Sequence, residues 1–295
     1  MDRSTPDPLA IARSLGLADG ERATAVAGGA DTAIWRVDAG GATYALRLFR
    51  PEQAAMAARE VVAMGAAADG GLPVPSIRAA GTWQDRPALL MPWLPGRTVA
   101  DELGRRPWRG WRLGVEFGRV QAAVHGVPAP AALRDHPLPW IEWATPDDAL
   151  RHRLRAIVDQ PEALLHLDYH PRNVLVVDGR VSAVLDWANA RAGDRRADLA
   201  RTASILRFAP LAGGAPPFAA RLARAAFTAG WRRGYRAVAG PTTEMAPFYA
   251  WAGAIIIRDL APRLGRPDLT WLTPAFFARV RSWTAAWRAR AGLPS

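Results

Sequence analysis

The segment Leu165–Trp187 reads LHLDYHPRNVLVVDGRVSAVLDW. It places His166, Asp168 and Asn173 in the order H-x-D-x-x-x-x-N, and Asp186 follows at the end of a second apolar run. Two valine-rich runs joined by an Asp-Gly pair lie between these polar residues, which is the pattern of a β-hairpin. We therefore predict a short hairpin with an Asp and an Asn at its start and a second Asp at its end.

This arrangement favours phosphoryl transfer from a magnesium nucleotide, in which the protein orients a hydroxyl, holds the metal and neutralises the phosphates. Asp168 is a candidate to orient the substrate hydroxyl or to accept its proton. Asn173 and Asp186 carry the hard oxygen ligands that Mg²⁺ prefers. Taken singly, such an Asp or Asn is usually a turn former or a helix cap. Their combination at this spacing favours a catalytic site.

The motif H-L-D-Y-H-P-R-N at 166–173, followed by L-D-W at 185–187, resembles the aminoglycoside phosphotransferase family. The G-D and D-L-A elements at 193–194 and 198–200 match the same pattern. The resemblance has landmarks from about residue 20 to 205. It implies small-molecule kinase activity, with ATP and Mg²⁺ as cofactors and His166, Asp168, Asn173 and Asp186 as catalytic residues.

The resemblance also implies an α+β, protein-kinase-like fold of two lobes. Residues 1–93 would form a small N-lobe, with an antiparallel sheet and one helix, that binds the nucleotide. Residues 94–295 would form a larger, mostly helical C-lobe that contains the catalytic hairpin, 165–187. Helices over about 201–290 would shape the site for the acceptor substrate.

The N-lobe sequence offers candidates for phosphate binding. Gly28 and Gly29 lie between two predicted strands, where a glycine turn lets backbone N–H groups approach phosphates. The kinase fold places a lysine on the third strand, predicted here at 43–49, but this chain contains no lysine. Arg47 is the candidate replacement, because its charged fork suits phosphate. Glu60, in a helix predicted from Pro51 to Ala68, would orient it.

Two alternatives to this pair are available nearby. Arg50 competes with Arg47, and Glu52 competes with Glu60. Glu52 would lie in the first helical turn, where a carboxylate simply complements the helix dipole, so Glu60 is preferred.

The segment Met91, Pro92, Trp93 and Leu94 resembles the hinge that joins the lobes and holds adenine. Two strands, near 77–83 and 86–91, are predicted to precede it. Recognition there would use the carbonyl of Pro92 and the N–H of Leu94. A plain proline-rich linker also fits this sequence.

Other helices are predicted at 7–16, 98–104 and 108–126, and from a cap at Thr145, with Pro146 at the first helical position, to about Asp159. His125 is interpreted as a packed structural residue, and Asp198 as a brace for the catalytic loop. The helical remainder contains aromatic residues that either line a pocket or, more commonly at this spacing, belong to the core. They are Trp231, Tyr235, Tyr249, Trp251 and Trp271.

The charge of the 295-residue chain is uneven. All 38 basic residues are arginine, which together with abundant Ala, Gly and Pro indicates a coding bias. Residues 1–199 contain 24 Arg and 24 acids, whereas residues 200–295 contain 14 Arg and 3 acids. If these helices form the acceptor site, a polycationic aminoglycoside would be steered poorly. We therefore expect a neutral or anionic acceptor.

The sequence excludes several other classes. There are no cysteines, hence no disulfide and no thiolate chemistry. The N-terminus has no apolar run typical of a signal peptide, and the longest apolar stretch, Pro247–Ile257, is short of the about 20 residues that span a bilayer. We expect a cytoplasmic protein with no membrane partner.

The partners expected are a nucleotide and a small-molecule hydroxyl acceptor. Nucleic acid is not expected, because no recognition motif accompanies the arginines. The space between Asp186 and Asp198 is too short for the activation loop of a protein kinase. The main alternative is a non-catalytic nucleotide-binding module, since the usual lysine is missing and the glycine loop is abbreviated.

Overall fold

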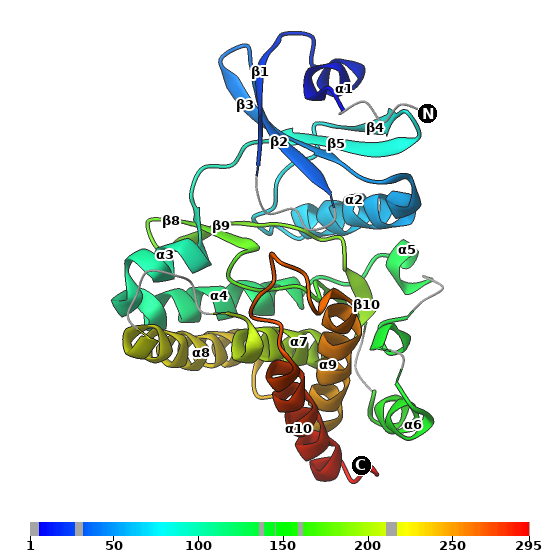
Figure 1. Ribbon diagram of the computed structural model, residues 1–295, viewed down its shortest axis with the longest axis vertical. Coiled ribbons are helices and arrows are strands. Elements are labelled where there is room, and N and C mark those ends of the chain that lie inside the picture. The colour runs from blue at the N-terminus through cyan, green and yellow to red at the C-terminus, as the bar shows by residue number, and fades with distance from the viewer. Residues whose placement is uncertain are drawn as a thin grey trace.

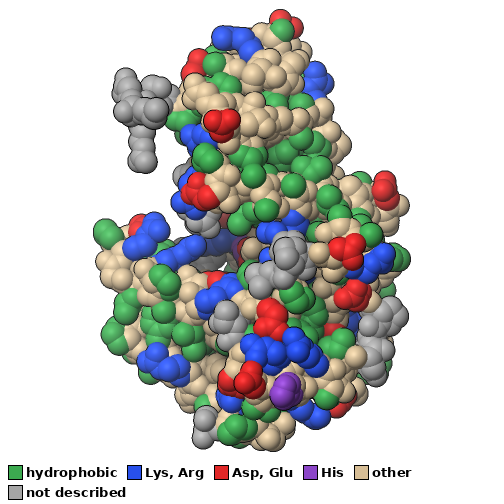
Figure 2. Space-filling view, turned by 90° about the vertical axis from the view of Figure 1, so that its right-hand side faces the viewer, with side chains coloured by type: hydrophobic (Ala, Val, Ile, Leu, Met, Phe, Trp, Pro, Cys, Tyr) green, Lys and Arg blue, Asp and Glu red, His purple; other side chains and the backbone are tan. Residues whose placement is uncertain are grey.

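The computed structural model describes residues 6–26, 32–135, 139–144, 146–158, 162–210 and 217–294. A small N-lobe built on a β-sheet lies over a larger helical C-lobe (Figure 1). The predicted α+β fold with two lobes is confirmed. Figure 2 shows a hollow where the lobes meet, with arginine side chains along it.

The strands are β1 (Gly20–Ala25), β2 (Ala33–Ala39), β3 (Ala42–Leu48), β4 (Ala79–Trp83), β5 (Arg86–Pro92), β6 (Arg97–Thr98), β7 (Ala163–Leu165), β8 (Val174–Val177), β9 (Arg180–Val184) and β10 (Arg191–Gly193). The α-helices are α1 (Pro8–Ser14), α2 (Ala54–Asp69), α3 (Val99–Arg105), α4 (Gly110–Val124), α5 (Ala131–Arg134), α6 (Asp148–Ile157), α7 (Arg195–Phe208), α8 (Pro217–Ala239), α9 (Met245–Leu260) and α10 (Pro274–Arg290). Short 3₁₀ turns occupy Pro51–Gln53, Pro107–Arg109, Glu142–Ala144 and Ala261–Arg263.

The N-lobe sheet has the order β1-β2-β3-β5-β4, and its strand pairs are antiparallel. Gln84 and Asp85 join β4 to β5 with positive φ angles of 47° and 60°, the conformation of a tight hairpin turn whose twist matches the strands. Leu46, Leu48 and Leu90 are fully buried beneath α1. Strand β3 is therefore the central strand of the sheet, and α2 packs against the sheet at β5 (Figure 1).

The predicted catalytic hairpin is confirmed as β8 and β9, which pair antiparallel. Asp178 and Gly179 form its turn with φ angles of 52° and 82°, so both turn residues have the positive φ that an Asp-Gly pair accommodates. Strand β6 adds to the outer edge of β8, and β7 pairs with β10 beside the hairpin. Of the polar motif residues, His166, Asp168 and Asn173 lie between β7 and β8, and Asp186 follows β9.

One helix start differs from the prediction. Asp147, not Thr145, caps α6, because its carboxylate accepts the backbone N–H of Leu150 at 2.9 Å. Pro146 therefore precedes the cap and does not occupy the first helical position. Thr145 and Asp159 lie outside the described residues. In the described part of the chain we find no helix with the length and apolar character needed to cross a bilayer.

Helices α4 and α8 pack unusually closely, and glycines make this possible. Gly114 and Gly118 on α4 face carbonyl oxygens of Phe227 and Trp231, and a Cβ at either glycine would collide with them. Gly234 on α8 faces α4 in the same way. This contact sets the position of α8 beneath the catalytic loop.

This close packing predicts that Gly118→Ala destabilises the protein. The added methyl group collides with rigid backbone, and overpacking of this kind costs about 1–3 kcal/mol. Gly65→Ala on α2 is the matched control, since nothing lies within 4 Å of its Cβ and alanine favours a helix. Urea denaturation should show a loss for the first variant and none for the second. Equal stability of the two variants would contradict this packing.

Candidate active site

The loop between β7 and β8 carries the H-x-D motif, and a buried carboxylate on α7 holds it. Asp198 accepts the backbone N–H groups of His166 at 3.1 Å and Leu167 at 2.8 Å. Leu167 has a positive φ of 60°, a strained conformation for a leucine that these bonds help to maintain. His125 Nε2 lies 2.9 Å from Asp198, and its Nδ1 lies 2.8 Å from the Tyr235 hydroxyl. The expected structural roles of His125 and Asp198 therefore agree with these contacts.

His166 is fully buried, and its ring makes hydrogen bonds inside the loop and to the end of the hairpin. Its Nδ1 accepts the N–H of Asp168 at 3.2 Å, and its Nε2 lies 3.0 Å from the carbonyl of Leu185. Burial lowers the pKa of His166, so the ring is neutral, with its proton on Nε2. No part of His166 reaches solvent, and its contacts tie the loop to the end of the hairpin, while its predicted catalytic role stays a prediction.

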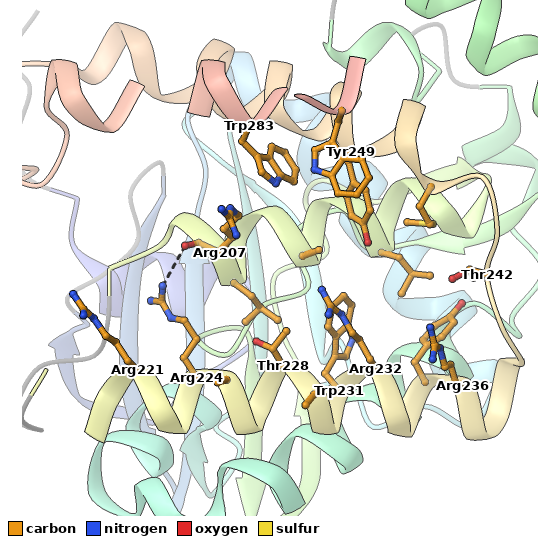
Figure 3. A pocket seen from close by; sticks show the side chains of 18 residues that line it. Arg207, Arg221, Arg224, Thr228, Trp231, Arg232, Arg236, Thr242, Tyr249 and Trp283 are labelled. Carbon is orange, nitrogen blue, oxygen red and sulfur yellow. Dashed lines mark hydrogen bonds between the residues drawn. The ribbon is translucent and has the colours of Figure 1, made fainter. Parts of the chain in front are cut away.

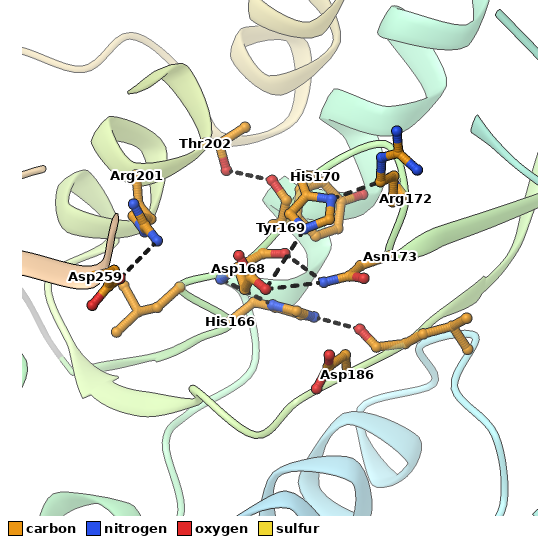
Figure 4. Close-up of polar contacts among 12 residues, drawn as sticks. His166, Asp168, Tyr169, His170, Arg172, Asn173, Asp186, Arg201, Thr202 and Asp259 are labelled. Carbon is orange, nitrogen blue, oxygen red and sulfur yellow. Dashed lines mark hydrogen bonds and ion pairs between the residues drawn. The ribbon is translucent and has the colours of Figure 1, made fainter. Parts of the chain in front are cut away.

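Asp168 is the carboxylate that the loop presents to the cleft. Asn173 Nδ2 donates to its backbone carbonyl at 3.0 Å and to its Oδ2 at 3.2 Å. Burial alone would raise the pKa of Asp168, but the hydrogen bond and charge of His170 and the charge of Arg201 lower it to about 2. Asp168 is therefore ionised at neutral pH, and Asn173 fixes its orientation (Figure 4).

Asp186 follows β9 and lies beside Asn173. The N–H of Leu185 donates to the carbonyl of Asn173 at 2.8 Å, which joins the two ends of the hairpin. Asp186 has a positive φ of 61°, and its side chain is 42% exposed. Figure 4 shows it on the same side of the loop as Asn173.

Arg47 lies at the centre of the N-lobe side of the site. Its guanidinium donates to Glu60 Oε1 at 2.6 Å, to Asp186 Oδ1 at 3.0 Å and to the Thr32 hydroxyl at 3.1 Å. Burial opposes its charge, but Glu60 and Asp186 outweigh that effect and raise the pKa of Arg47. Arg47 thus remains charged and connects β3, α2 and the catalytic hairpin.

Glu60 is 1% exposed, and its Oε2 has no hydrogen-bond partner among the described residues. Burial raises its pKa to about 7, while Arg47 acts in the opposite direction. The competing residues Arg50 and Glu52 pair with each other at 3.3 Å on the surface, with side chains more than half exposed. Geometry therefore favours Arg47 and Glu60 for the role at the site.

The segment predicted as the hinge begins at the end of β5. The N–H of Trp93 donates to the carbonyl of Thr43 at 2.8 Å, so this pair is hydrogen-bonded across β3 and β5. Antiparallel ladders alternate, which leaves Pro92 and Tyr44 as a non-bonded pair and turns the Pro92 carbonyl away from β3. Met91 is buried where β5 ends.

Gly28 and Gly29 lie outside the described residues, and the assignment of a phosphate loop stays a prediction. The division of the lobes between residues 93 and 94 also stays a prediction. Thr32, which bonds Arg47, and Arg201, whose charge acts on Asp168, were not singled out from the sequence. Arg201 follows Asp198 by three residues on α7, and that helical spacing is the signal that would have identified it.

The site's oxygen ligands suit a magnesium ion shared with phosphates. Within the described residues no group of three or more His, Cys, Asp or Glu is arranged to hold a metal. Asn173 uses its amide nitrogen in the loop, which leaves Oδ1 for another partner. Together with the Asp186 carboxylate this is a small oxygen set, as expected where Mg²⁺ takes further ligands from a nucleotide.

Comparisons with known proteins agree with this geometry. The model of the "Phosphotransferase enzyme family" matches residues 22–239. No curated protein gives a significant match. A putative aminoglycoside phosphotransferase from Ralstonia eutropha is structurally similar, with a TM-score of 0.66, 21% identity and 96% of each chain covered.

Two further solved structures, both of ligand complexes, are similar. One is a thermostable mutant of aminoglycoside phosphotransferase APH(4)-Ia in a ternary complex with ADP and hygromycin B. It has a TM-score of 0.66 and 15% identity, covering 98% of this chain and 99% of that chain. The other is the amicoumacin kinase hAmiN in complex with AMP-PNP, Ca²⁺ and Ami, with a TM-score of 0.66 and 15% identity over 97% and 94% of the two chains.

Glu60 gives a prediction for stability against pH. Its pKa of about 7 in the folded protein exceeds the ordinary value of 4.5, so the folded state binds this proton more tightly. The stability due to Glu60 is therefore fully present below pH 4.5 and is lost as the pH rises to about 7.

We expect Glu60→Gln to abolish this component of the pH profile, which for one proton has a slope of at most about 1.4 kcal/mol per pH unit. Urea denaturation across that window measures it, with the exposed Glu52→Gln as control. A Glu60→Gln profile parallel to wild type would contradict the assignment.

Proposed function

We propose that this chain, which belongs to the phosphotransferase enzyme family, transfers the γ-phosphate of Mg-ATP to a hydroxyl group of a small molecule. The observation that carries the proposal is the arrangement of Arg47, Asp168, Asn173 and Asp186 around one hairpin where the lobes meet. It supplies an orienting carboxylate, oxygen ligands for a metal and a fixed cation for phosphate.

The nucleotide would bind between the lobes. The carbonyl of Pro92, which faces away from β3, and the N–H of Leu94 would hydrogen-bond the adenine. Arg47, held by Glu60, would contact the phosphates with a charge that is in place before the nucleotide arrives. Asn173 and Asp186 would hold Mg²⁺, which neutralises charge on the phosphate oxygens when bound. The nucleotides named for the two similar structures support this reading.

Asp168 would orient the acceptor hydroxyl. With a pKa of about 2 it is a weak base, so it would accept the proton only late in a loose transition state. The loop fixes this carboxylate through Asn173 on one side and through the backbone bonds to Asp198 on the other. Positioning of the hydroxyl is therefore the main contribution that we assign to it.

The charged residues near Asp168 indicate which charge the acceptor substrate would carry. Arg201 is buried on α7, and its charge lowers the pKa of Asp168. Asp259 is already paired with Arg201 at 3.2 Å and with Arg258. An acceptor that approaches Asp168 thus meets arginine rather than free carboxylates, which supports a neutral or anionic acceptor over a polycationic aminoglycoside.

The direct test is ADP release from Mg-ATP with a panel of sugars, amino alcohols, macrolides, hydroxy acids and aminoglycosides. We expect turnover to depend on an acceptor, and neutral or anionic acceptors to exceed polycations. Asp168→Asn should lower kcat by about 10²–10⁴-fold while AMP-PNP still binds. Asp178→Asn, in the hairpin turn where asparagine tolerates positive φ, should remain active.

Wild-type turnover in Asp168→Asn would contradict the mechanism. Nucleotide binding without turnover of any acceptor, equal in both variants, would favour the non-catalytic module instead.

A further inference from the structure

A second cavity lies in the C-lobe, enclosed by α7, α8, α9 and α10 (Figure 3). Its volume is about 870 Å³, within the range of small-molecule sites. None of the residues assigned above to nucleotide, metal or hydroxyl lines it. Its α7 side is formed by Leu199 and Ala203, whereas Asp198 and Arg201 on the same helix act on the catalytic loop.

The cavity has a strongly positive lining. Five arginines contribute to it and no carboxylate does, among the residues described; the arginines are Arg207, Arg221, Arg224, Arg232 and Arg236. The three acids of the C-terminal region, Glu244, Asp259 and Asp268, all pair with arginines outside the cavity. The charge of these five side chains is therefore not compensated by the acids of their own region.

Four of these arginines recur at helical spacing on one face of α8, so the helix turns them into the same space (Figure 3). Arg224 is held there, since its guanidinium donates to the carbonyls of Ala209 at 2.6 Å and Arg207 at 3.2 Å. The other three on α8, Arg221, Arg232 and Arg236, are exposed to solvent. An anion entering the cavity would meet charge at several points along α8.

The opposite wall is aromatic. Tyr249 packs on Trp287 and Trp283 with ring centroids 4.5 and 5.8 Å apart, and Figure 3 shows Tyr249 and Trp283 facing α8 across the cavity. This wall therefore offers flat aromatic faces on which a ring can stack.

We propose that this cavity is a binding site for a small organic anion with an apolar, ring-bearing body. The acidic group, a carboxylate, phosphate or sulfonate, would lie among the arginines of α8, and the body would stack on Tyr249, Trp283 and Trp287. The residues assigned above to the nucleotide, the metal and the acceptor hydroxyl do not line this cavity. Of the aromatic residues that the sequence singled out, Trp231, Tyr235 and Tyr249 line this cavity, whereas Trp251 is core.

The probe for the test is anilinonaphthalene sulfonate, which carries one sulfonate on an aromatic body, with uncharged phenylnaphthylamine as its comparison. Binding is followed by fluorescence in the full chain. We expect the sulfonate to bind at least about tenfold more tightly than the uncharged probe. Saturating Mg-AMP-PNP should not displace it.

The double variant Arg232→Gln/Arg236→Gln should weaken sulfonate binding by about tenfold, because it removes the binding free energy of two exposed charged contacts. Arg233→Gln/Arg281→Gln is the matched control, because it removes the same charge from exposed positions that do not line the cavity. Equal affinity in the two double variants, equal affinity for the two probes, or displacement by the nucleotide would each overturn the proposal. Because binding is measured without turnover, the result is independent of the kinase activity.

Discussion

The structure depends on one buried cation. Arg47 contacts Thr32, which directly precedes β2, and it also contacts Glu60 on α2 and Asp186 in the C-lobe. A single guanidinium therefore joins the sheet, the N-lobe helix and the catalytic hairpin. Removing one partner from such a buried pair typically costs about 3–5 kcal/mol, because the other charge remains uncompensated. The planar fork of arginine makes these three contacts at once, and a lysine would offer a point charge instead. In this chain, therefore, the absence of lysine does not leave the site without a cation.

A second constraint on the site comes from α7 in the C-lobe. Asp198 is fully buried, and it uses its two oxygens to bond the backbone of the loop that presents Asp168. The arrangement holds a strained Leu167 and gives the two acids different positions: Asp198 is buried and bonds the loop, while Asp168 lies on the loop, where we propose that it orients the acceptor hydroxyl. Further contacts join the lobes, from Arg59 to the carbonyl of Ala188 at 3.0 Å and from Val184 N–H to Pro73 at 2.7 Å. The site is thus rigid on both sides of the cleft.

The hairpin could be predicted from sequence, because an Asp-Gly turn between two valine-rich runs permits few other structures. Arg47 and Glu60 could be placed by the resemblance and by the position of Glu60 in mid-helix. The bond to Thr32 could not, since it depends on side chains brought together by folding. Arg201 could have been identified by its helical spacing from Asp198, but its effect on the pKa of Asp168 depends on the fold. The excess of arginine was expected at the acceptor site. The structure places five of those arginines around a cavity of the C-lobe, four on α8 and Arg207 on α7, because helical periodicity decides which way each side chain points.

The central claim is that Arg47 provides the phosphate-binding cation of a nucleotide site. Calorimetric titration of Mg-AMP-PNP into wild type, Arg47→Met and Arg50→Met tests it most directly. We expect magnesium-dependent binding of AMP-PNP by wild type and by Arg50→Met. Arg47→Met should bind the nucleotide at least about tenfold more weakly, because it loses a charged hydrogen-bonding group. Wild-type affinity in Arg47→Met, or no binding of nucleotide by any of the three proteins, would contradict it.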